Sequence, residues 1–463
     1  MEMTEQLIKR IEAGLFDQRL IDVYGCSKTE AAQQASRLIH VLRLFAKTFP
    51  DDLRGPGKTD QTVNGQQEAE AEPILLFSAP GRTEIGGNHT DHQQGRVLAA
   101  SINRDILAAV RPNGKNRICL LSEGYGMDVI DLADLTVRES EKNTSIALIR
   151  GIANRFRALG HPVTGFDACV ISNVPKGSGL SSSAAFEVLL GNVMNTLFAD
   201  DQVNPVEIAR IGQYAENHYY GKPCGLMDQM ASAIGGIIAI DFKDPARPVF
   251  ERISFDLTGA GLALCILDSG ADHGDLTEEY AAIPREMKSV AKALGHTVLR
   301  DVDEQAFMDA VPRIRPTVGD RAILRAMHFF SDDRRVAAEV NALKAHNLAE
   351  FRRLIIESGR SSQVLLQNTY ASGSTKEQSV ALVLAFCERH LSAAGGAWRV
   401  HGGGFAGTVQ AFVPVGLVDG FRRSMEAVFG AGSCHPIHVR PTGGCCVINR
   451  SDVRALDRKP DVV

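Results

Sequence analysis

The segment that most constrains this chain is a run of glycines and serines between a predicted strand and a predicted helix. Residues 175–185 read Pro-Lys-Gly-Ser-Gly-Leu-Ser-Ser-Ser-Ala-Ala, and a strand is predicted just before them, at 168–171. Gly177 and Gly179 end that strand, and the serines at 181–183 can cap the helix that follows. Backbone N–H groups converge in such a loop, and the helix start adds positive potential. The segment therefore indicates an anion site, such as one for a nucleotide phosphate, with a flexible turn as the alternative.

Two other glycine motifs do not fit the nucleotide-binding patterns that they resemble. Residues 57–59 read Gly-Lys-Thr, but the glycine that a Walker A motif needs upstream is Asp52. Residues 402–407 match G-x-G-x-x-G, yet a strand is predicted directly after them, at 409–413. A dinucleotide-binding fold needs a helix there, so the pattern excludes it. The glycines at 402–404 still allow close approach of a loop or a ligand.

The composition is that of an ordinary soluble protein of roughly two or three domains, at about 100–200 residues each. The chain has 463 residues, and its 50 basic and 55 acidic side chains give a net charge of −5. This charge excludes a strongly basic nucleic-acid scaffold. No apolar run approaches the roughly 18 residues of a membrane span, and no signal peptide is recognisable. The nine cysteines include no C-x-x-C pair. We therefore expect a cytoplasmic protein with reduced thiols and no nucleic-acid or membrane partner.

Hydrophobic periodicity divides the chain into three parts. Helical spacing of apolar residues, with a capping box at Ser27–Glu30, predicts a helical extension over residues 1–50. Hydrophobic residues nearly vanish at 51–72, where we predict a mobile linker. Beyond it, predicted strands and helices intermix without a strict alternation, which favours an α+β fold over a doubly wound parallel sheet.

A second polar cluster follows a predicted strand and reads Ala-Pro-Gly-Arg-Thr-Glu-Ile-Gly-Gly-Asn-His-Thr-Asp-His at 79–92. His89, Asp91 and His92 are residue types that ligate metals. Adjacent Asp91 and His92 point in different directions in an extended chain, which weakens a shared site. A polar turn whose residues hydrogen-bond one another is the alternative.

A third segment places an acidic residue among apolar neighbours. Residues 221–232 read Gly-Lys-Pro-Cys-Gly-Leu-Met-Asp-Gln-Met-Ala-Ser, with Asp228 inside the apolar part. We expect a partly desolvated carboxylate with a raised pKa, unless a cation lies nearby. Glu216 precedes it by twelve residues, near the end of a predicted helix. Either residue could instead be an ordinary surface carboxylate.

Four segments in this order resemble the motifs of the GHMP small-molecule kinases, and most closely those of the galactokinase family. Residues 81–92 resemble the family's first signature, and 176–184 resemble its phosphate loop. Residues 224–229 are similar to the segment that carries the catalytic base, and 401–407 resemble the glycine-rich third motif. The resemblance covers residues 73–449, so the first fifty residues fall outside it.

The resemblance implies a two-domain GHMP-kinase-like α+β fold with the active site in the cleft between the domains. The first domain, 73–250, would hold nucleotide and sugar, and 251–463 would form the second. The implied activity is an ATP-dependent sugar 1-kinase, with galactose as the expected sugar and Mg²⁺ as the metal. The implied partners are a small-molecule sugar and ATP, while the oligomeric state stays open.

The resemblance also implies roles for individual residues. Asp228 would take the proton from the anomeric hydroxyl, and Arg82 would keep Asp228 ionised. Ser183 and Glu216 would hold Mg²⁺. The implied nucleotide-binding residues are Lys176, Gly177, Ser178, Gly179, Leu180, Ser181, Ser182, Ser183 and Ala184. The implied substrate-binding residues are Asn88, His89, Asp91, Gly225 and Tyr280.

This chain departs from the family pattern mainly at the sugar. Asn88 stands where the family has Glu, and Glu84 stands where it has Asn. His92 replaces a Tyr, and residues 404–408 read Gly-Phe-Ala-Gly-Thr in place of Gly-Phe-Gly-Gly-Cys. The alternatives are therefore the same chemistry on galacturonate, arabinose or an N-acetylated hexosamine, a sugar-sensing regulator built on an inactive kinase, and a metal hydrolase.

Overall fold

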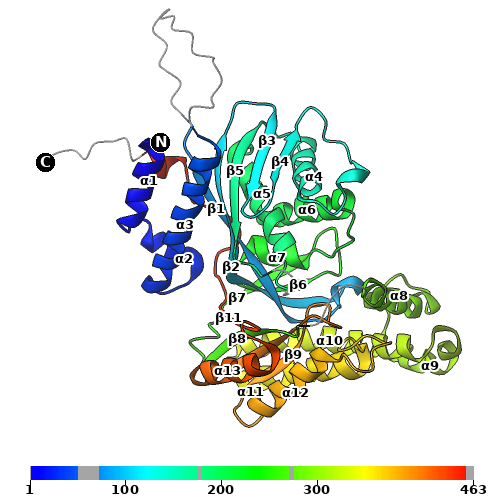
Figure 1. Cartoon of the computed structure of the whole chain (residues 1–463). Coiled ribbons are helices and arrows are strands. Elements are labelled where there is room, and N and C mark those ends of the chain that lie inside the picture. The colour runs from blue at the N-terminus through cyan, green and yellow to red at the C-terminus, as the bar shows by residue number, and fades with distance from the viewer. Residues whose placement is uncertain (1, 51–71, 176–178, 271–275, 455–463) are drawn as a thin grey trace, which may run out of the picture.

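The fold is built on two β-sheets, a large one of eight strands and a small one of four (Figure 1). The computed structural model describes residues 2–50, 72–175, 179–270 and 276–454. The large sheet contains β1 (Leu75–Gly86), β2 (Arg96–Pro112), β3 (Arg117–Ser122), β4 (Met127–Asp131), β5 (Phe166–Ser172), β6 (Ile237–Asp241), β7 (Val249–Ile253) and β12 (Cys445–Ile448). The small sheet contains β8 (Leu262–Asp268), β9 (Ala397–His401), β10 (Thr408–Pro414) and β11 (Cys434–Ile437).

The strand β2 is the centre of the large sheet, where it pairs with β1, β5 and β6, and its neighbour β1 is buried along its whole length. The strand order of the large sheet is β12-β1-β2-β5-β3-β4, and β6 pairs with the first residues of β2. Every pair is antiparallel except β3–β5. The β1–β2 register shifts between Pro80 and Arg82 and again between Glu84 and Gly86. Such irregularities redirect side chains, and these two flank the signature residues Arg82 and Glu84.

Helices cover both faces of the large sheet, which explains why β1 is buried throughout (Figure 1). On one face lie α4 (Ser145–Ala158), α5 (Ser182–Phe198), α6 (Pro205–Ala215) and α7 (Met227–Ile234). Successive strand residues point to opposite faces. Phe77 accordingly joins the core beneath these helices, whereas Leu76 joins a second core on the other face.

The N-terminal extension builds that second core. It consists of α1 (Glu2–Glu12), α2 (Asp17–Tyr24) and α3 (Lys28–Thr48). The predicted capping box is confirmed at the start of α3, where Ser27 and Glu30 exchange backbone and side-chain hydrogen bonds. The extension is thus packed against the sheet and is continuous with the body of the protein.

The small sheet is entirely antiparallel, in the order β11-β8-β10-β9, and lies against a helical layer (Figure 1). Its half of the chain contains α8 (Thr277–Ala293), α9 (Glu304–Val318), α10 (Asp320–Lys344), α11 (Leu348–Ser361), α12 (Ser379–Leu391) and α13 (Val418–Phe429). Shorter helical turns are η2 (Asp91–Gln93), η3 (Glu139–Glu141), η4 (Glu216–Tyr220), η5 (Leu299–Asp301), η6 (Ser362–Leu366), η7 (Val415–Leu417) and α14 (Arg450–Arg454).

The predicted α+β class is confirmed, and the sheets refine the predicted organisation. The boundary that we predicted between residues 250 and 251 falls inside β7, which belongs to the large sheet. The chain end also returns to the large sheet, since β12 pairs with β1. The predicted linker 51–72 lies outside the described residues except for Glu72. No helix in the described ranges is both long and apolar enough to cross a membrane.

Candidate active site

The centre of the candidate site is an ion pair between Arg82 on β1 and Asp228 at the start of α7. Arg82 Nε donates to Asp228 Oδ1 at 2.6 Å, and Nη2 donates to Oδ2 at 2.7 Å. The third nitrogen of the guanidinium donates to the carbonyl of Gly179, and the hydroxyl of Ser181 donates to Asp228. Two predicted catalytic residues, 146 positions apart in sequence, thus meet at the predicted phosphate loop.

The ion pair with Arg82 keeps the carboxyl of Asp228 in its ionised form. Burial raises the pKa of this carboxyl, but Arg82 and the Ser181 hydroxyl lower it more strongly, and the net pKa lies below its ordinary value. We expected a raised pKa for Asp228 unless a cation lies nearby, and Arg82 is such a cation. Asp228 is ionised at neutral pH and can accept a proton.

The start of α5 presents backbone N–H groups to the same place. The helix begins at Ser182, and Ser181 in the N-cap position has φ +54° and makes no capping hydrogen bond with its side chain. The prediction that Ser181 caps the helix is therefore wrong, because its hydroxyl binds Asp228 instead. Helix N–H groups without a cap attract anions. The predicted residues Lys176, Gly177 and Ser178 lie outside the described part of the chain.

The glycine at 179 is required by its surroundings. Its φ is +67°, and a Cβ there would lie 3.1 Å from both His401 Nδ1 and Thr408 Oγ1. His401 Nε2 accepts a hydrogen bond from the backbone N–H of Glu84, which makes Nε2 the unprotonated nitrogen of the ring. Burial lowers the pKa of His401 well below its ordinary value, so the ring is neutral. The third motif thus packs directly on the first and second.

The two predicted metal ligands face each other beside the loop. Ser183 Oγ donates to Glu216 Oε1 at 3.4 Å, and Lys222 Nζ lies 3.7 Å from the same oxygen. A hydroxyl and a carboxylate are hard oxygen donors, and Mg²⁺ commonly takes one or two protein oxygens together with phosphate oxygens. In the described ranges no group of three or more His, Cys, Asp or Glu side chains is arranged to hold a metal. These two residues fit a cation that arrives with a nucleotide.

Two residues of this region escaped the sequence analysis. Gln229 Nε2 donates to Glu216 Oε2 at 2.9 Å and to Glu187 Oε2 at 3.0 Å. Burial raises the pKa of Glu187 well above its ordinary value, and the charge of Glu216 raises it further. The available signal was spacing, because Glu187 follows Ser183 by one helical turn and therefore shares its face of α5.

The predicted sugar-binding residues form two contact groups. His89 Nε2 lies 3.1 Å from the carbonyl oxygen of Gly403, and Tyr280 donates to the carbonyl of Gly404 at 3.1 Å. In the second group, the carboxylate of Asp91 lies against Gly225, where a Cβ would come within 2.3 Å of Oδ2. Burial and the nearby His92 lower the pKa of His89 to about 3, so this ring is neutral.

Both polar atoms of the Asn88 side chain are hydrogen-bonded within the protein. Its Nδ2 donates to Glu84 Oε1 at 3.0 Å and to the carbonyl of Gly402 at 2.7 Å. Its Oδ1 accepts from Asn368 Nδ2 at 2.9 Å and from Ser362 Oγ at 3.3 Å. The side chain is fully buried. A sugar contact by Asn88 stays a prediction, and it requires that one of these bonds be exchanged.

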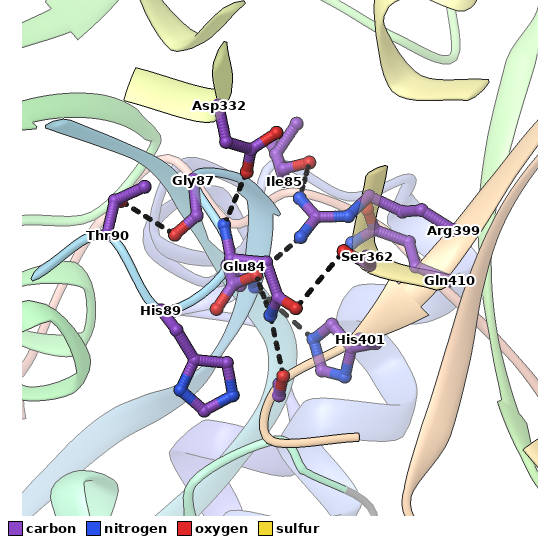
Figure 2. A network of polar contacts seen from close by, with 12 residues as sticks. Glu84, Ile85, Gly87, His89, Thr90, Asp332, Ser362, Arg399, His401 and Gln410 are labelled. Atoms are coloured by element: carbon purple, nitrogen blue, oxygen red, sulfur yellow. Dashed lines mark hydrogen bonds and ion pairs between the residues drawn. The ribbon is translucent and has the colours of Figure 1, made fainter. Parts of the chain in front are cut away.

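Glu84 completes this network and is the carboxylate that the sequence analysis placed at a departure from the family pattern. Arg399 Nη2 donates to Glu84 Oε1 at 2.7 Å, and both side chains are buried (Figure 2). Burial raises the pKa of Glu84 to about 7 although Arg399 opposes the shift. The carboxylate and the amide are thus both present here, with their positions exchanged relative to the family pattern.

The comparison with known proteins defines the class first. The GHMP kinases N terminal domain matches residues 147–236, and the galactokinase galactose-binding signature matches 66–112. A mevalonate kinase from Methanococcus jannaschii shares the fold with a TM-score of 0.57 and 14% identity, over 80% of this chain and 99% of that one. The protein has the GHMP kinase fold.

A more similar sequence defines the family within this class. A galactokinase from Streptomyces coelicolor is 32% identical over 364 residues, which cover 78% of this chain and 90% of that protein. The crystal structure of Lactococcus lactis galactokinase complexed with galactose matches with a TM-score of 0.73 and 23% identity, over 89% of this chain and all of that one. The chain belongs to the galactokinase family.

Proposed function

We propose that this protein is an ATP-dependent galactose 1-kinase, which converts galactose and ATP to galactose 1-phosphate and ADP. The observation that carries the proposal is the Arg82–Asp228 pair beside the uncapped start of α5. It joins an ionised base, a fixed cation and an anion-binding helix start. Phosphoryl transfer needs chiefly this kind of positioning and charge stabilisation.

Asp228 acts as the base that takes the proton of the anomeric hydroxyl. Its lowered pKa keeps it ionised, and its two hydrogen bonds to Arg82 fix its orientation. Arg82 also offsets the negative charge that moves onto the transferred phosphoryl. A planar guanidinium suits this double role, because it can contact a carboxylate and a phosphate together.

The nucleotide binds with its phosphates at the segment 176–184 and the start of α5. Ser183 and Glu216 would hold Mg²⁺, whose chemistry is to neutralise charge on the β- and γ-phosphates. Lys222 lies near the same carboxylate and adds positive charge at the edge of the site. The enzyme works in the cytoplasm on two small molecules, the sugar and ATP.

The sugar lies between the two contact groups of the predicted substrate-binding residues. Asp91 supplies a carboxylate acceptor beside Gly225, and a larger residue at 225 would occupy its place. His89 and Tyr280 stand on the glycine loop of the third motif, which brings the second half of the chain to the sugar. Glu84 and Asn88 are buried beside these groups and hydrogen-bond each other.

A coupled ADP-release assay with a panel of monosaccharides tests the proposal. The panel contains galactose, galacturonate, arabinose and an N-acetylated hexosamine, and NMR of the product identifies the phosphorylated position. We expect the highest kcat/KM with galactose and a phosphate on the anomeric oxygen. A higher kcat/KM with another sugar would move the substrate and keep the chemistry. Nucleotide and sugar binding without ADP release would indicate a regulator.

A further inference from the structure

The amide of Gln229 lies between two buried carboxylates that come from different helices. Its Nε2 donates to Glu187 Oε2 on α5 and to Glu216 Oε2 at the end of α6, at 3.0 and 2.9 Å. Gln229 and Glu187 have no exposed surface, and Glu216 is 3% exposed. The reverse orientation of the amide would place its oxygen against Oε2 of Glu216, which is an acceptor, so the donor assignment follows from this partner.

This amide gives the two oxygens of Glu216 different surroundings. Oε2 accepts from Gln229, whereas Oε1 faces Ser183 Oγ at 3.4 Å and Lys222 Nζ at 3.7 Å. A carboxylate that loses the bond to Gln229 is free to rotate about its terminal torsion, which has a broad energy minimum. Hydrogen bonds of this kind orient metal ligands, and their loss typically weakens metal binding.

Gly212 on α6 leaves room for Gln229 and Glu187 to lie side by side. A Cβ on Gly212 of α6 would lie 3.0 Å from Glu187 Cβ and Oε2, and 3.4 Å from Gln229 Cγ. Gln229 also follows Asp228 directly, and Asp228 is fixed by Arg82. The first turn of α7 therefore carries the base and the amide on consecutive positions, and it fixes the base relative to Glu216.

We propose that Gln229 is a positioning residue for Glu216: its amide, supported by Glu187, turns Oε1 of Glu216 toward Ser183 for binding the nucleotide-bound divalent cation. The inference rests on the proposed function, which assigns Glu216 as a ligand of that cation. A purely structural role in packing α5 against α6 and α7 would lower stability and leave the affinity for the cation unchanged.

The test measures Mn²⁺ binding in the presence of ADP by EPR, where no turnover occurs. Gln229→Met keeps the side-chain length and removes both donors, and we expect about tenfold weaker Mn²⁺ binding. Binding of ADP without metal and of galactose alone should be unchanged. Glu187→Gln retains an uncharged acceptor of the same shape and should bind Mn²⁺ like the wild type.

A matched control is Gln213→Met on α6. Gln213 lies three residues before Glu216, and its side chain donates to the carbonyl of Cys224 at 3.2 Å. Its bond with Glu216 is a backbone hydrogen bond to the Gln213 carbonyl, which the substitution retains. Its Mn²⁺ affinity should equal that of the wild type. If Gln229→Met does not fold, Gln229→Asn replaces it, because the shortened amide stays polar and withdraws from Glu216.

The variant Glu216→Ala separates this inference from the proposed function. Weaker Mn²⁺ binding in Glu216→Ala together with wild-type binding in Gln229→Met, or in its Asn replacement, overturns the positioning role alone. Wild-type binding in Glu216→Ala overturns the assignment of the metal ligand, and the inference falls with it. Equal weakening in Gln213→Met would also overturn the inference, since the effect would not depend on the bond to Glu216.

Discussion

The contact between Arg82 and Asp228 serves both partners of the proposed reaction. The guanidinium keeps the base ionised while Ser181 and Gly179 hold the pair against the phosphate loop. Since the charged forms stabilise each other, the pair is set for proton transfer before substrates arrive.

Replacement of Asp228 tests the base. Asp228→Asn should lower kcat by about 10²–10⁴-fold, because an amide cannot take up a proton at neutral pH. ADP binding should change little, because the amide has the same shape and its oxygen can still accept a hydrogen bond from Ser181 or Arg82. Steady-state kinetics and calorimetry measure the two quantities. Retention of more than about a tenth of wild-type turnover would contradict the assignment.

Arg82→Ala should lower kcat more than it raises the sugar KM, because the charge that Arg82 opposes grows during transfer. It should also move the acidic limb of kcat/KM to higher pH. Arg82 lowers the pKa of Asp228 and burial raises it, so the raising effect remains when the guanidinium is removed. Arg82→Lys should restore activity only in part, because Lys lacks the planar fork. An unchanged kcat with a raised sugar KM would show that Arg82 binds the ground state of the sugar.

Glu84 and Asn88 should behave as one unit. Asn88→Glu alone places a second buried carboxylate against Glu84, where Arg399 is the cation in contact. We expect the exchange Glu84→Asn with Asn88→Glu to recover much of the lost stability, with a coupling of about 0.5–3 kcal/mol. Urea unfolding of the wild type, the two single variants and the double variant measures this coupling. The ratio of kcat/KM for galactose and galacturonate in the same set shows whether Asn88 contributes to sugar selectivity. A zero coupling would show that the two residues act separately.

Among the elements, the N-terminal helices are joined to the sheet by a buried ion network. Asp105 on β2 accepts from Arg37 on α3 at 2.6 Å and lies 3.3 Å from Arg440. Tyr24 on α2 donates to the same carboxylate. Burial alone would raise the pKa of Asp105, yet Arg37 and Arg440 hold it below its ordinary value. The extension is thus part of the fold, and its removal would leave a buried charge.

Asp105→Asn should lower the free energy of unfolding by about 3–5 kcal/mol at pH 7, because buried arginines lose their counter-charge. The pKa of Asp105 is lower in the folded protein than in the unfolded chain, where it is about 4. Asp105 therefore stabilises the folded protein at pH values above about 4, and this contribution is lost as the pH falls through the folded-state pKa. The difference between the two proteins should therefore shrink below about pH 4. Urea unfolding across pH measures it, with the exposed Asp419→Asn as control. A difference independent of pH would contradict this account.

At the scale of the whole molecule, the large sheet is connected to α10 by a closed ring of ion pairs. Arg300 lies 2.7 Å from both Asp241 on β6 and Asp333 on α10. Arg96 on β2 contacts the same two carboxylates at 3.2 and 2.7 Å. The ring and the return of β12 to β1 fix the second half of the chain on the first. The sugar-binding groups need this arrangement, since they come from both halves.

Arg300→Ala should lower the free energy of unfolding by about 2 kcal/mol, between the values for exposed and buried ion pairs. The sugar KM should rise more than the KM for ATP, because α10, which carries Asp333, also carries Asp332, the acceptor of the backbone N–H of the predicted sugar-binding residue Asn88. Denaturant unfolding and steady-state kinetics measure both effects. Arg315→Ala, which breaks an exposed pair with Asp320, is the matched control and should change neither. Equal effects in the two variants would contradict the role of the ring.

Features that depend on neighbours within one helical turn could be predicted. The capping box at Ser27 is confirmed, because its hydrogen bonds span three residues. The prediction of a capping bond by Ser181 failed because a residue distant in sequence intervenes. Its local pattern favours a helix cap, but a partner 47 residues away takes its hydroxyl.

The α+β class, the order of four motifs and the residue types that phosphoryl transfer needs follow from the sequence. Which of these residues meet depends on the tertiary structure. It placed Arg82 on Asp228, tied Asn88 to Asn368 at a separation of 280 residues, and revealed Glu187 and Gln229. Local preferences arise from contacts within a few residues. Pairing across hundreds of residues instead depends on how both faces of the sheets are covered, and burial then sets the pKa values of the groups brought together.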